Sequence, residues 1–200
     1  MKHESLWADV WYRFRKNKMA MFGLIVLILL ILCAIFADFI APYGYDDQNL
    51  DIAIQGPSME HLFGTDNFGR DIFSRIVYGS RISLQVGLLA VGVAIVVGGI
   101  FGAVAAFYGK TVDSVIMRLM DVLLAIPGML LAIAIAATLG PGLGNMMIAI
   151  AIGNVPGYAR VVRAAVLTVK EQEYIEAAQS IGANDIRVIF RHILPNAMAP

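Results

Sequence analysis

Residues Ile82 to Gly109 read ISLQVGLLAVGVAIVVGGIFGAVAAFYG, a block of 28 residues without a charged side chain. The block exceeds the roughly 20 apolar residues that a membrane-spanning helix needs. Two further uncharged blocks occur, 19 residues from Met19 to Ala37 and 38 residues from Val122 to Ala159. Only 15% of the 200 residues are charged and 59% are hydrophobic, where a soluble domain has about 25% charged residues. The pattern indicates a protein whose solvent is the bilayer.

The third block is too long for one span, because 38 residues reach roughly 57 Å at about 1.5 Å per residue and the hydrocarbon core is about 30 Å thick. Gly140-Pro141-Gly142-Leu143-Gly144 supplies a turn at which it folds back. We therefore predict an all-α, polytopic transmembrane helical bundle. Its four spans are 19–39, 82–107, 122–139 and 145–163.

Basic residues predict the orientation of the spans, since Lys and Arg accumulate on the cytoplasmic side of membrane proteins. Twelve of them fall on one side and three on the other. The twelve are Lys2, Arg13, Arg15, Lys16, Lys18, Lys110, Arg118, Arg160, Arg163, Lys170, Arg187 and Arg191, and the three are Arg70, Arg75 and Arg81. We expect cytoplasmic segments at 1–18, 108–121 and 164–200, an extracytoplasmic segment at 40–81 and an external turn at 140–144. Both termini of the chain would then be cytoplasmic.

A cleaved secretory signal is the alternative for the first span. Its 19 uncharged residues exceed a usual signal core, and no small-x-small cleavage site precedes Asp38. We expect this segment to remain in the membrane.

Two of the spans carry small residues at every fourth position. They are Ala90, Ala94, Gly98, Gly102 and Ala106 in the second span, and Ala149, Gly153 and Gly157 in the fourth. Such stripes let helix backbones approach closely in lipid, so both helices should pack against other helices. Pro127 and Pro156 lie inside predicted spans, where proline tends to kink a helix.

Several classes of function are excluded by composition and spacing. A net charge of zero removes the case for nucleic-acid binding. The middle of each span lacks ionisable residues, which ion-coupled carriers usually need, so an energy source outside the membrane is favoured but an ion-coupled carrier is not excluded. Gly109-Lys110-Thr111 resembles the end of a phosphate-binding loop, but Val104 stands where that loop needs glycine. The histidines have no metal-ligand spacing and no nucleophile motif occurs, so we expect no enzyme activity, cofactor or metal.

The segment after the fourth span predicts a helix, a turn and a second helix. Tyr174, Ala177, Ala178 and Ile181 share one face of the first helix, and Gly182 supplies a left-handed cap. Asn184 or Asp185 can cap the second helix, which Pro195 would end. The apolar stripe expected on that second helix is Ile186, Ile189, Phe190 and Ile193.

The same segment resembles the cytoplasmic EAA loop of binding-protein-dependent ABC import permeases. The resemblance rests on Glu176-Ala177-Ala178, on Gly182 after three intervening residues, and on Leu194-Pro195 after a fixed interval. His192 stands where the family pattern has isoleucine, and the string Arg191 to Asn196 is similar to the peptide and nickel branch. The resemblance implies a type I importer permease fold and a coupling helix within 173–195 that docks on a separate ATPase. Its residues would be Tyr174, Glu176, Ala177, Ala178, Gly182, Leu194 and Pro195.

A second resemblance lies outside the membrane. Two segments, His61 to Arg75 and Tyr78 to Leu84, are similar to the external part of "C" permease subunits for dipeptides, oligopeptides and nickel. The segment Trp11 to Pro42 is similar to the first helix of those subunits and its flanks. Asp71 can cap a short helix whose Ile72, Phe73, Ile76 and Val77 lie on the membrane surface. Because Arg70, Arg75 and Arg81 oppose the positive-inside bias, we expect partners for them, with Asp66 and Asp71 as internal candidates. Asp66, Arg70, Asp71 and Arg75 are also the residues that could contact an extracytoplasmic binding protein. Their spacing does not fit a calcium loop.

The resemblance further implies a prokaryotic inner membrane, ATP-binding subunits, a second permease subunit, a substrate-binding protein and contact with membrane lipid. Family members continue into two more spanning helices after the EAA loop, whereas this sequence stops at Pro200. We expect either a fragment or a truncated permease that does not close a translocation path alone. Two alternatives stay open, an ion-coupled secondary carrier or channel and a membrane anchor without a transport role.

Overall fold

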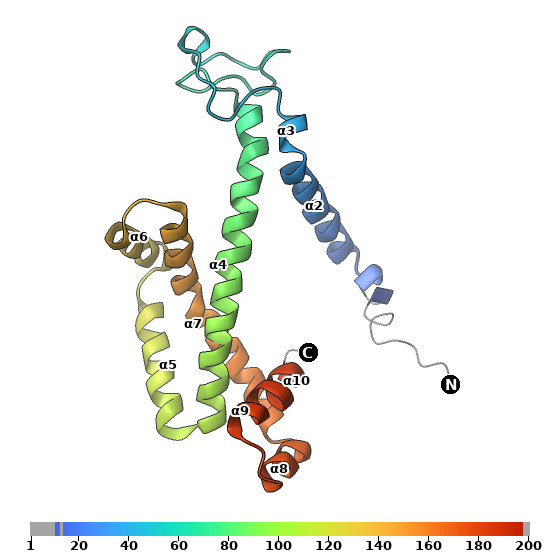
Figure 1. The fold of residues 1–200 in the computed structure, drawn as a ribbon, viewed down its shortest axis with the longest axis vertical. Coiled ribbons are helices and arrows are strands. Elements are labelled where there is room, and N and C mark those ends of the chain that lie inside the picture. The colour runs from blue at the N-terminus through green and yellow to red at the C-terminus, as the bar shows by residue number, and fades with distance from the viewer. Residues whose placement is uncertain (1–10, 13, 198–200) are drawn as a thin grey trace. The chain divides into compact units, whose positions relative to one another are not determined.

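A computed structural model describes residues 11–12 and 14–197 of the chain, so that Lys2 and Arg13, which entered the prediction of orientation, lie outside the described residues. Within the described part the named elements are all helices (Figure 1). They are α2 (Lys18–Ile35), α3 (Ala37–Ile40), the 3₁₀ turn η1 (Leu50–Ile52), α4 (Ile72–Tyr108), α5 (Lys110–Ala125), α6 (Gly128–Leu139), α7 (Leu143–Lys170), α8 (Glu173–Ser180), α9 (Asp185–Arg187), the π-helix η2 (Val188–Ile193) and α10 (Leu194–Ala197).

The chain forms two compact units, which we describe separately. The first comprises residues 1–85 and the second residues 86–200, and α4 belongs to both. In the second unit α5, α6 and α7 lie beside the later part of α4, and the short helices α8 to α10 gather near the end of α7 (Figure 1).

Two helices of the described chain are long and apolar enough to cross a membrane, α2 and α4, or up to three if the bent pair α5–α6 is one span. Asn17 caps the start of helix α2, since its side chain accepts hydrogen bonds from the backbone N–H groups of Met19 and Ala20 at 3.1 and 3.2 Å. Helix α7 is also long, with 28 residues, but Asn145, Asn154 and two arginines lower its hydropathy. The membrane topology with four spans therefore stays a prediction.

Helix α4 corrects the expectation of a separate short helix ahead of the second span. It runs without interruption for 37 residues from Ile72, so the ten residues before the predicted span at 82 belong to the same helix. No proline lies between residues 72 and 108, and Gly79 alone does not end a helix, since a single glycine costs only about 1 kcal/mol.

Helix α5 replaces the loop expected at 108–121. The connection from α4 is the single residue Gly109, whose φ of 64° is in the left-handed region that glycine tolerates best. The charges at Lys110, Asp113, Arg118 and Asp121 are spaced at three to five residues, which is compatible with the polar face of an amphipathic helix.

Pro127 breaks the predicted span 122–139 into two helices. Helix α5 ends at Ala125, α6 begins at Gly128, and their axes differ by 92°. A proline has no N–H to donate and its ring clashes with the preceding turn, so the helix cannot pass through this position at low cost. Pro156, by contrast, lies inside the continuous helix α7.

The small-residue stripe of α4 packs against α7, which confirms that these helices meet other helices. Ala94 is fully buried, and a β-carbon added at Gly98 would lie 2.6 Å from the carbonyl oxygen of Val155. At Gly102 the added atom would lie 2.3 Å from the carbonyl oxygen of Ala159. Both distances are shorter than any real contact, so only glycine permits this approach.

Ion pairs join α5 to α7 in the same unit. Arg163 donates from Nε and Nη2 to the two carboxylate oxygens of Asp113, each at 2.6 Å. Arg160 donates to Asp121, also at 2.6 Å. The two-pronged arrangement of Arg163 is the stronger of the two, because a planar guanidinium matches a carboxylate.

Candidate functional site

The segment after α7 folds into a helical hairpin, residues 173–197. We call it the coupling hairpin after the role that its resemblance to the EAA loop implies. Helix α8 ends where Gly182 takes a φ of 80° and Ala183 N–H donates to the carbonyl of Ala178 at 3.1 Å, as in a Schellman cap. Asn184 then caps α9, its side chain accepting from the backbone N–H of Ile186 at 3.1 Å. The predicted left-handed glycine and the predicted cap are both confirmed.

An apolar core holds the coupling hairpin against the long helices of its unit. Ile175 from α8 and Val188 and Ile193 from η2 are at most 1% exposed. They form one cluster with buried residues of the long helices, namely Ala103, Ala106 and Phe107 of α4 and Val166 of α7. Burial of such side chains contributes on the order of 1.5–3 kcal/mol each, so the hairpin is fixed to the ends of α4 and α7.

The buried faces differ from those predicted. In α8, Ile175 and Ala178 are buried, whereas Tyr174 is 44% and Ile181 86% exposed. In the second half of the hairpin Ile189 and Ile193 are buried as expected, but Ile186 and Phe190 are exposed and Val188 takes their place in the core.

A π-helix explains why the buried face of the second half of the hairpin differs from the predicted one. Residues 188–193 form η2, in which hydrogen bonds reach back five residues, and Leu194 N–H donates to the carbonyl of Ile189. The wider turn rotates later residues relative to a 3.6-residue repeat. Pro195 does not end the helix, which corrects the prediction, because it is the second residue of α10 and α10 follows η2 without a break.

Polar contacts that sequence reasoning missed join α7 to α4 through Lys170 and anchor the hairpin to α4 through Tyr108. Lys170 Nζ donates to the carbonyls of Phe107 at 2.6 Å and Ala106 at 3.2 Å, so the last residue of α7 caps the end of α4. Tyr108 donates its hydroxyl proton to Asp185 of α9 at 3.0 Å. The partners are 63 to 77 residues apart in sequence, and no local pattern signals such pairs.

The predicted coupling residues thus divide into an exposed face and a supporting set. The side chains of Tyr174, Glu176 and Ala177 are exposed on α8, and Pro195 is exposed on α10. Ala178 is buried and Leu194 is half-buried against the core of the hairpin, while Gly182 forms the turn.

The extracytoplasmic segment of the prediction contains a second set of functional candidates, centred on Asp66. Its carboxylate accepts from the guanidinium of Arg70 at 2.8 Å and from the backbone N–H groups of Phe68 at 2.8 Å and Arg70 at 3.1 Å. Arg75 also donates to it. Desolvation raises the pKa of Asp66, but the hydrogen bonds from Arg70 and Phe68 outweigh it and hold the pKa well below its ordinary value. The expected internal ion pairs of Arg70 and Arg75 are confirmed.

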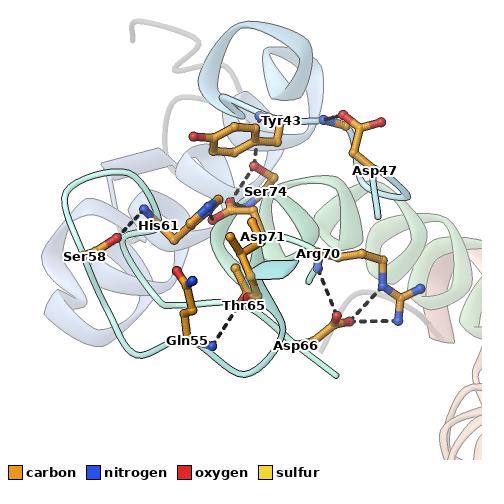
Figure 2. A network of polar contacts seen from close by, with 12 residues as sticks. Tyr43, Asp47, Gln55, Ser58, His61, Thr65, Asp66, Arg70, Asp71 and Ser74 are labelled. Atoms are coloured by element: carbon orange, nitrogen blue, oxygen red, sulfur yellow. Dashed lines mark hydrogen bonds and ion pairs between the residues drawn. The ribbon is translucent and has the colours of Figure 1, made fainter. Parts of the chain in front are cut away.

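Asp71 lies at the centre of a buried network (Figure 2). One carboxylate oxygen is 3.0 Å from His61 Nδ1, and the other accepts from the backbone N–H and the hydroxyl of Ser74, each at 2.7 Å. The backbone of Tyr43 donates to the same hydroxyl at 3.2 Å. Desolvation raises the pKa of Asp71, yet the hydrogen bonds from Ser74 and His61 bring it below its ordinary value. Asp71 caps a helix as predicted, and that helix is α4.

Two of the expected partners are corrected. Arg81 pairs with Asp38, at 2.8 Å, instead of Asp66 or Asp71, and it also donates to the carbonyl of Ala34 at 2.6 Å. Asp71 pairs with a histidine instead of an arginine. Among the residues that the structure describes, no group of three or more metal-ligating side chains is arranged around a metal site.

Helices long and apolar enough to cross a bilayer, and close glycine contacts between them and other helices, define a helical membrane protein. Two family models match it. One, described as the N-terminal TM domain of oligopeptide transport permease C, matches residues 5–57. The other, the binding-protein-dependent transport system inner membrane component, matches residues 94–200, which include the coupling hairpin. The chain belongs to this family of inner-membrane transport components, and its resemblance to the C-type permeases of ABC importers is confirmed.

Curated relatives agree with the family. The dipeptide transport system permease protein DppC of Alkalihalophilus pseudofirmus is 50% identical over 196 residues, which cover 98% of this chain and 64% of the relative. The glutathione transport system permease protein GsiD of Shigella dysenteriae serotype 1 is 48% identical over 197 residues, covering 96% of this chain and 64% of the relative. GsiD of Escherichia coli O6:K15:H31 is 47% identical with the same coverage. The chain therefore spans 64% of the length of these relatives.

Proposed function

We propose that the chain is a membrane-spanning permease subunit of a binding-protein-dependent ABC importer for peptides. A second permease subunit would complete the pathway, a substrate-binding protein would deliver the peptide, and a separate ATPase would drive the cycle. The dipeptide and glutathione permeases among the relatives support a peptide substrate. Nickel, which the string Arg191 to Asn196 left open, is the alternative substrate.

The coupling hairpin carries this proposal. Its exposed side holds apolar groups that a soluble surface rarely shows together, since Ile181 is 86%, Ile186 66% and Phe190 53% exposed. Tyr174, Glu176 and Ala177 lie on the exposed part of α8. A short helix with small and aromatic side chains suits a groove on another protein, and we assign that groove to the ATPase.

The attachment of the hairpin favours transmission of motion over simple binding. Its buried core joins α4 and α7, and Lys170 and Tyr108 add polar contacts at the end of α4. A push on α8 would therefore move both long helices together, because packed cores do not deform continuously. The expected cytoplasmic position of 164–200 places the hairpin on the ATP side.

A matched pair of variants at Gly182 tests the coupling. Gly182→Val forces a β-branched residue into a left-handed conformation at a cost of about 1–2 kcal/mol, and Gly182→Asn tolerates that conformation. No atom lies within 4 Å of an added β-carbon, so the strain is confined to the backbone. In proteoliposomes with the complete transport system, we expect Gly182→Val to lose at least about tenfold in peptide uptake per ATP hydrolysed, roughly the factor that 1.4 kcal/mol represents. Gly182→Asn should remain close to wild type.

Normal uptake in the Gly182→Val system would contradict the coupling role. A second measurement addresses the ATPase itself, which should no longer co-purify when Glu176→Lys and Ala177→Trp are combined. Peptide-dependent proton or sodium flux without any ATPase would instead support a secondary carrier.

A further inference from the structure

A cavity of about 730 Å³ opens beside the first turns of α4, within the first unit. Arg75, Tyr78 and Ile82 line it from α4, and Tyr45 and Asp46 line it from the segment before α4. The spacing of the α4 residues, three and four apart, places them on one face of the helix. The cavity is separate from the Asp71 network and contains none of the coupling residues.

The charges around the cavity sum to zero, with Arg75 and Arg81 against Asp38 and Asp46. Arg81 and Asp38 are bound to each other, and Arg81 also holds the backbone at the end of α2. The other two charged groups, Arg75 and Asp46, can form further hydrogen bonds. Arg75 uses one of its terminal nitrogens for Asp66, and an arginine has five N–H donors. The carboxylate of Asp46 accepts no hydrogen bond from any residue of the described chain.

A ligand that satisfies both groups carries one negative and one positive charge. Anions or cations alone would leave either Asp46 or Arg75 without a counter-charge. Two aromatic rings also line the cavity, since the rings of Tyr45 and Tyr78 meet edge to face with centroids 5.8 Å apart. Tyrosines with this mixture of apolar ring and polar hydroxyl concentrate at the water interface of a bilayer.

The edge of the cavity farther along α4 is formed by Ile82 and Gln85. Ile82 is 51% exposed, and it is the residue at which the predicted second span begins. A ligand with a zwitterionic head between Arg75 and Asp46 could therefore extend an apolar tail past Ile82 into the hydrocarbon region.

We propose that this cavity binds the headgroup of a zwitterionic phospholipid of the phosphatidylethanolamine type, with its phosphate on Arg75 and its primary ammonium on Asp46. Charge-assisted hydrogen bonds to phosphate and carboxylate would hold the head, and the acyl chains leave along α4. The proposal uses the membrane setting of the family but neither the substrate nor the direction of transport. The lipid would brace the extracytoplasmic segment against α4.

Native mass spectrometry of the full chain tests the site. The protein is extracted from vesicles with equal amounts of phosphatidylethanolamine and phosphatidylglycerol, and the lipids that remain bound are counted. We expect wild type to retain phosphatidylethanolamine over phosphatidylglycerol by about fivefold, the size of one exposed ion pair. Asp46→Lys should remove or reverse this preference, because a lysine attracts the anionic lipid. Arg75→Gln should lower retention of both lipids.

The control is Asp51→Lys, which makes the same charge change at an exposed position of η1 that does not line the cavity. It should retain the wild-type preference. Equal retention of both lipids by wild type, or an unchanged preference in Asp46→Lys, would overturn the proposal. Two further results would also overturn it. If glycerophosphoethanolamine bound as tightly as the lipid, the exposed Ile82 would contribute nothing. If millimolar dialanine displaced the lipid, the cavity would be assigned to peptides.

Discussion

Different forces hold the coupling hairpin and the cluster around Asp66 and Asp71. The hairpin rests on fully buried Ile193 and Val188, with the hydrogen bond from Tyr108 to Asp185 as a polar addition. The cluster around Asp66 and Asp71 rests on hydrogen bonds and ion pairs, and its buried members include His61, Thr65 and Ser74. Apolar packing holds a shape whatever the pH, whereas a carboxylate network holds it only while the carboxylates are ionised.

The largest effect is expected from opening the apolar core of the hairpin. Ile193→Ala should destabilise residues 173–197 by about 2–4 kcal/mol, because it removes a side chain that is 0% exposed and leaves a cavity. Hydrogen exchange of the α8 and α10 amides measures the loss of local stability. The matched control is Ile186→Ala, whose side chain is 66% exposed and whose change should stay within about 0.5 kcal/mol. Similar exchange in both variants would show that the hairpin does not depend on this core.

A smaller effect is expected from Asp71→Ala. The variant removes the cap of α4 and the partner of His61 and Ser74, at a cost of about 1–3 kcal/mol. Exchange of the 41–74 amides should rise while exchange of the coupling hairpin stays unchanged. Glu60→Ala, an exposed carboxylate in the same segment, serves as the control. Faster exchange throughout the chain would contradict a local role.

Lowering the pH should have the smallest effect on local stability near neutrality, and it should give the clearest contrast between the two regions at acid pH. The pKa values of Asp66 and Asp71 are lowered in the folded chain, so the unfolded segment binds protons first and stability rises with pH. Their contribution is complete above the unfolded value of about 3.9 and is lost as the pH falls through the folded values. Exchange, corrected for its intrinsic pH dependence, should show the cluster unchanged from pH 7 to 5 and opening below about pH 4. The coupling hairpin should open less, and equal opening of both regions would refute the contrast.

The local sequence pattern was enough to predict the features that depend on residues a few positions apart. Gly182 and Asn184 were predicted as caps because a left-handed glycine and a side-chain cap act within a few residues. The pairing of Asp66 with Arg70 spans four residues and could be predicted in the same way. Pro127 predicted a kink within one helix, whereas the structure has two helices, α5 and α6, whose axes differ by 92°.

Other features could not be predicted because they depend on distant residues or on small differences in backbone energy. Arg81 meets Asp38 across 43 residues, and Lys170 meets Phe107 across 63. The π-helix at 188–193 moved Val188 into the core and left Phe190 exposed, against the regular 3.6-residue repeat. The loop predicted at 108–121 is a helix because charge alone does not prevent helix formation.

The sequence by itself determined that this is a helical membrane chain with a helix, a turn and a second helix that resemble an EAA loop, since apolar length, glycine spacing and the EAA pattern are local features. The tertiary structure alone decided how α4 and α7 approach through Gly98 and Gly102, which face of the hairpin is buried, and where Asp46 and Arg75 share a cavity. The physical reason is that burial and charge pairing depend on which surfaces meet, and segments far apart in the chain meet only once the helices have packed.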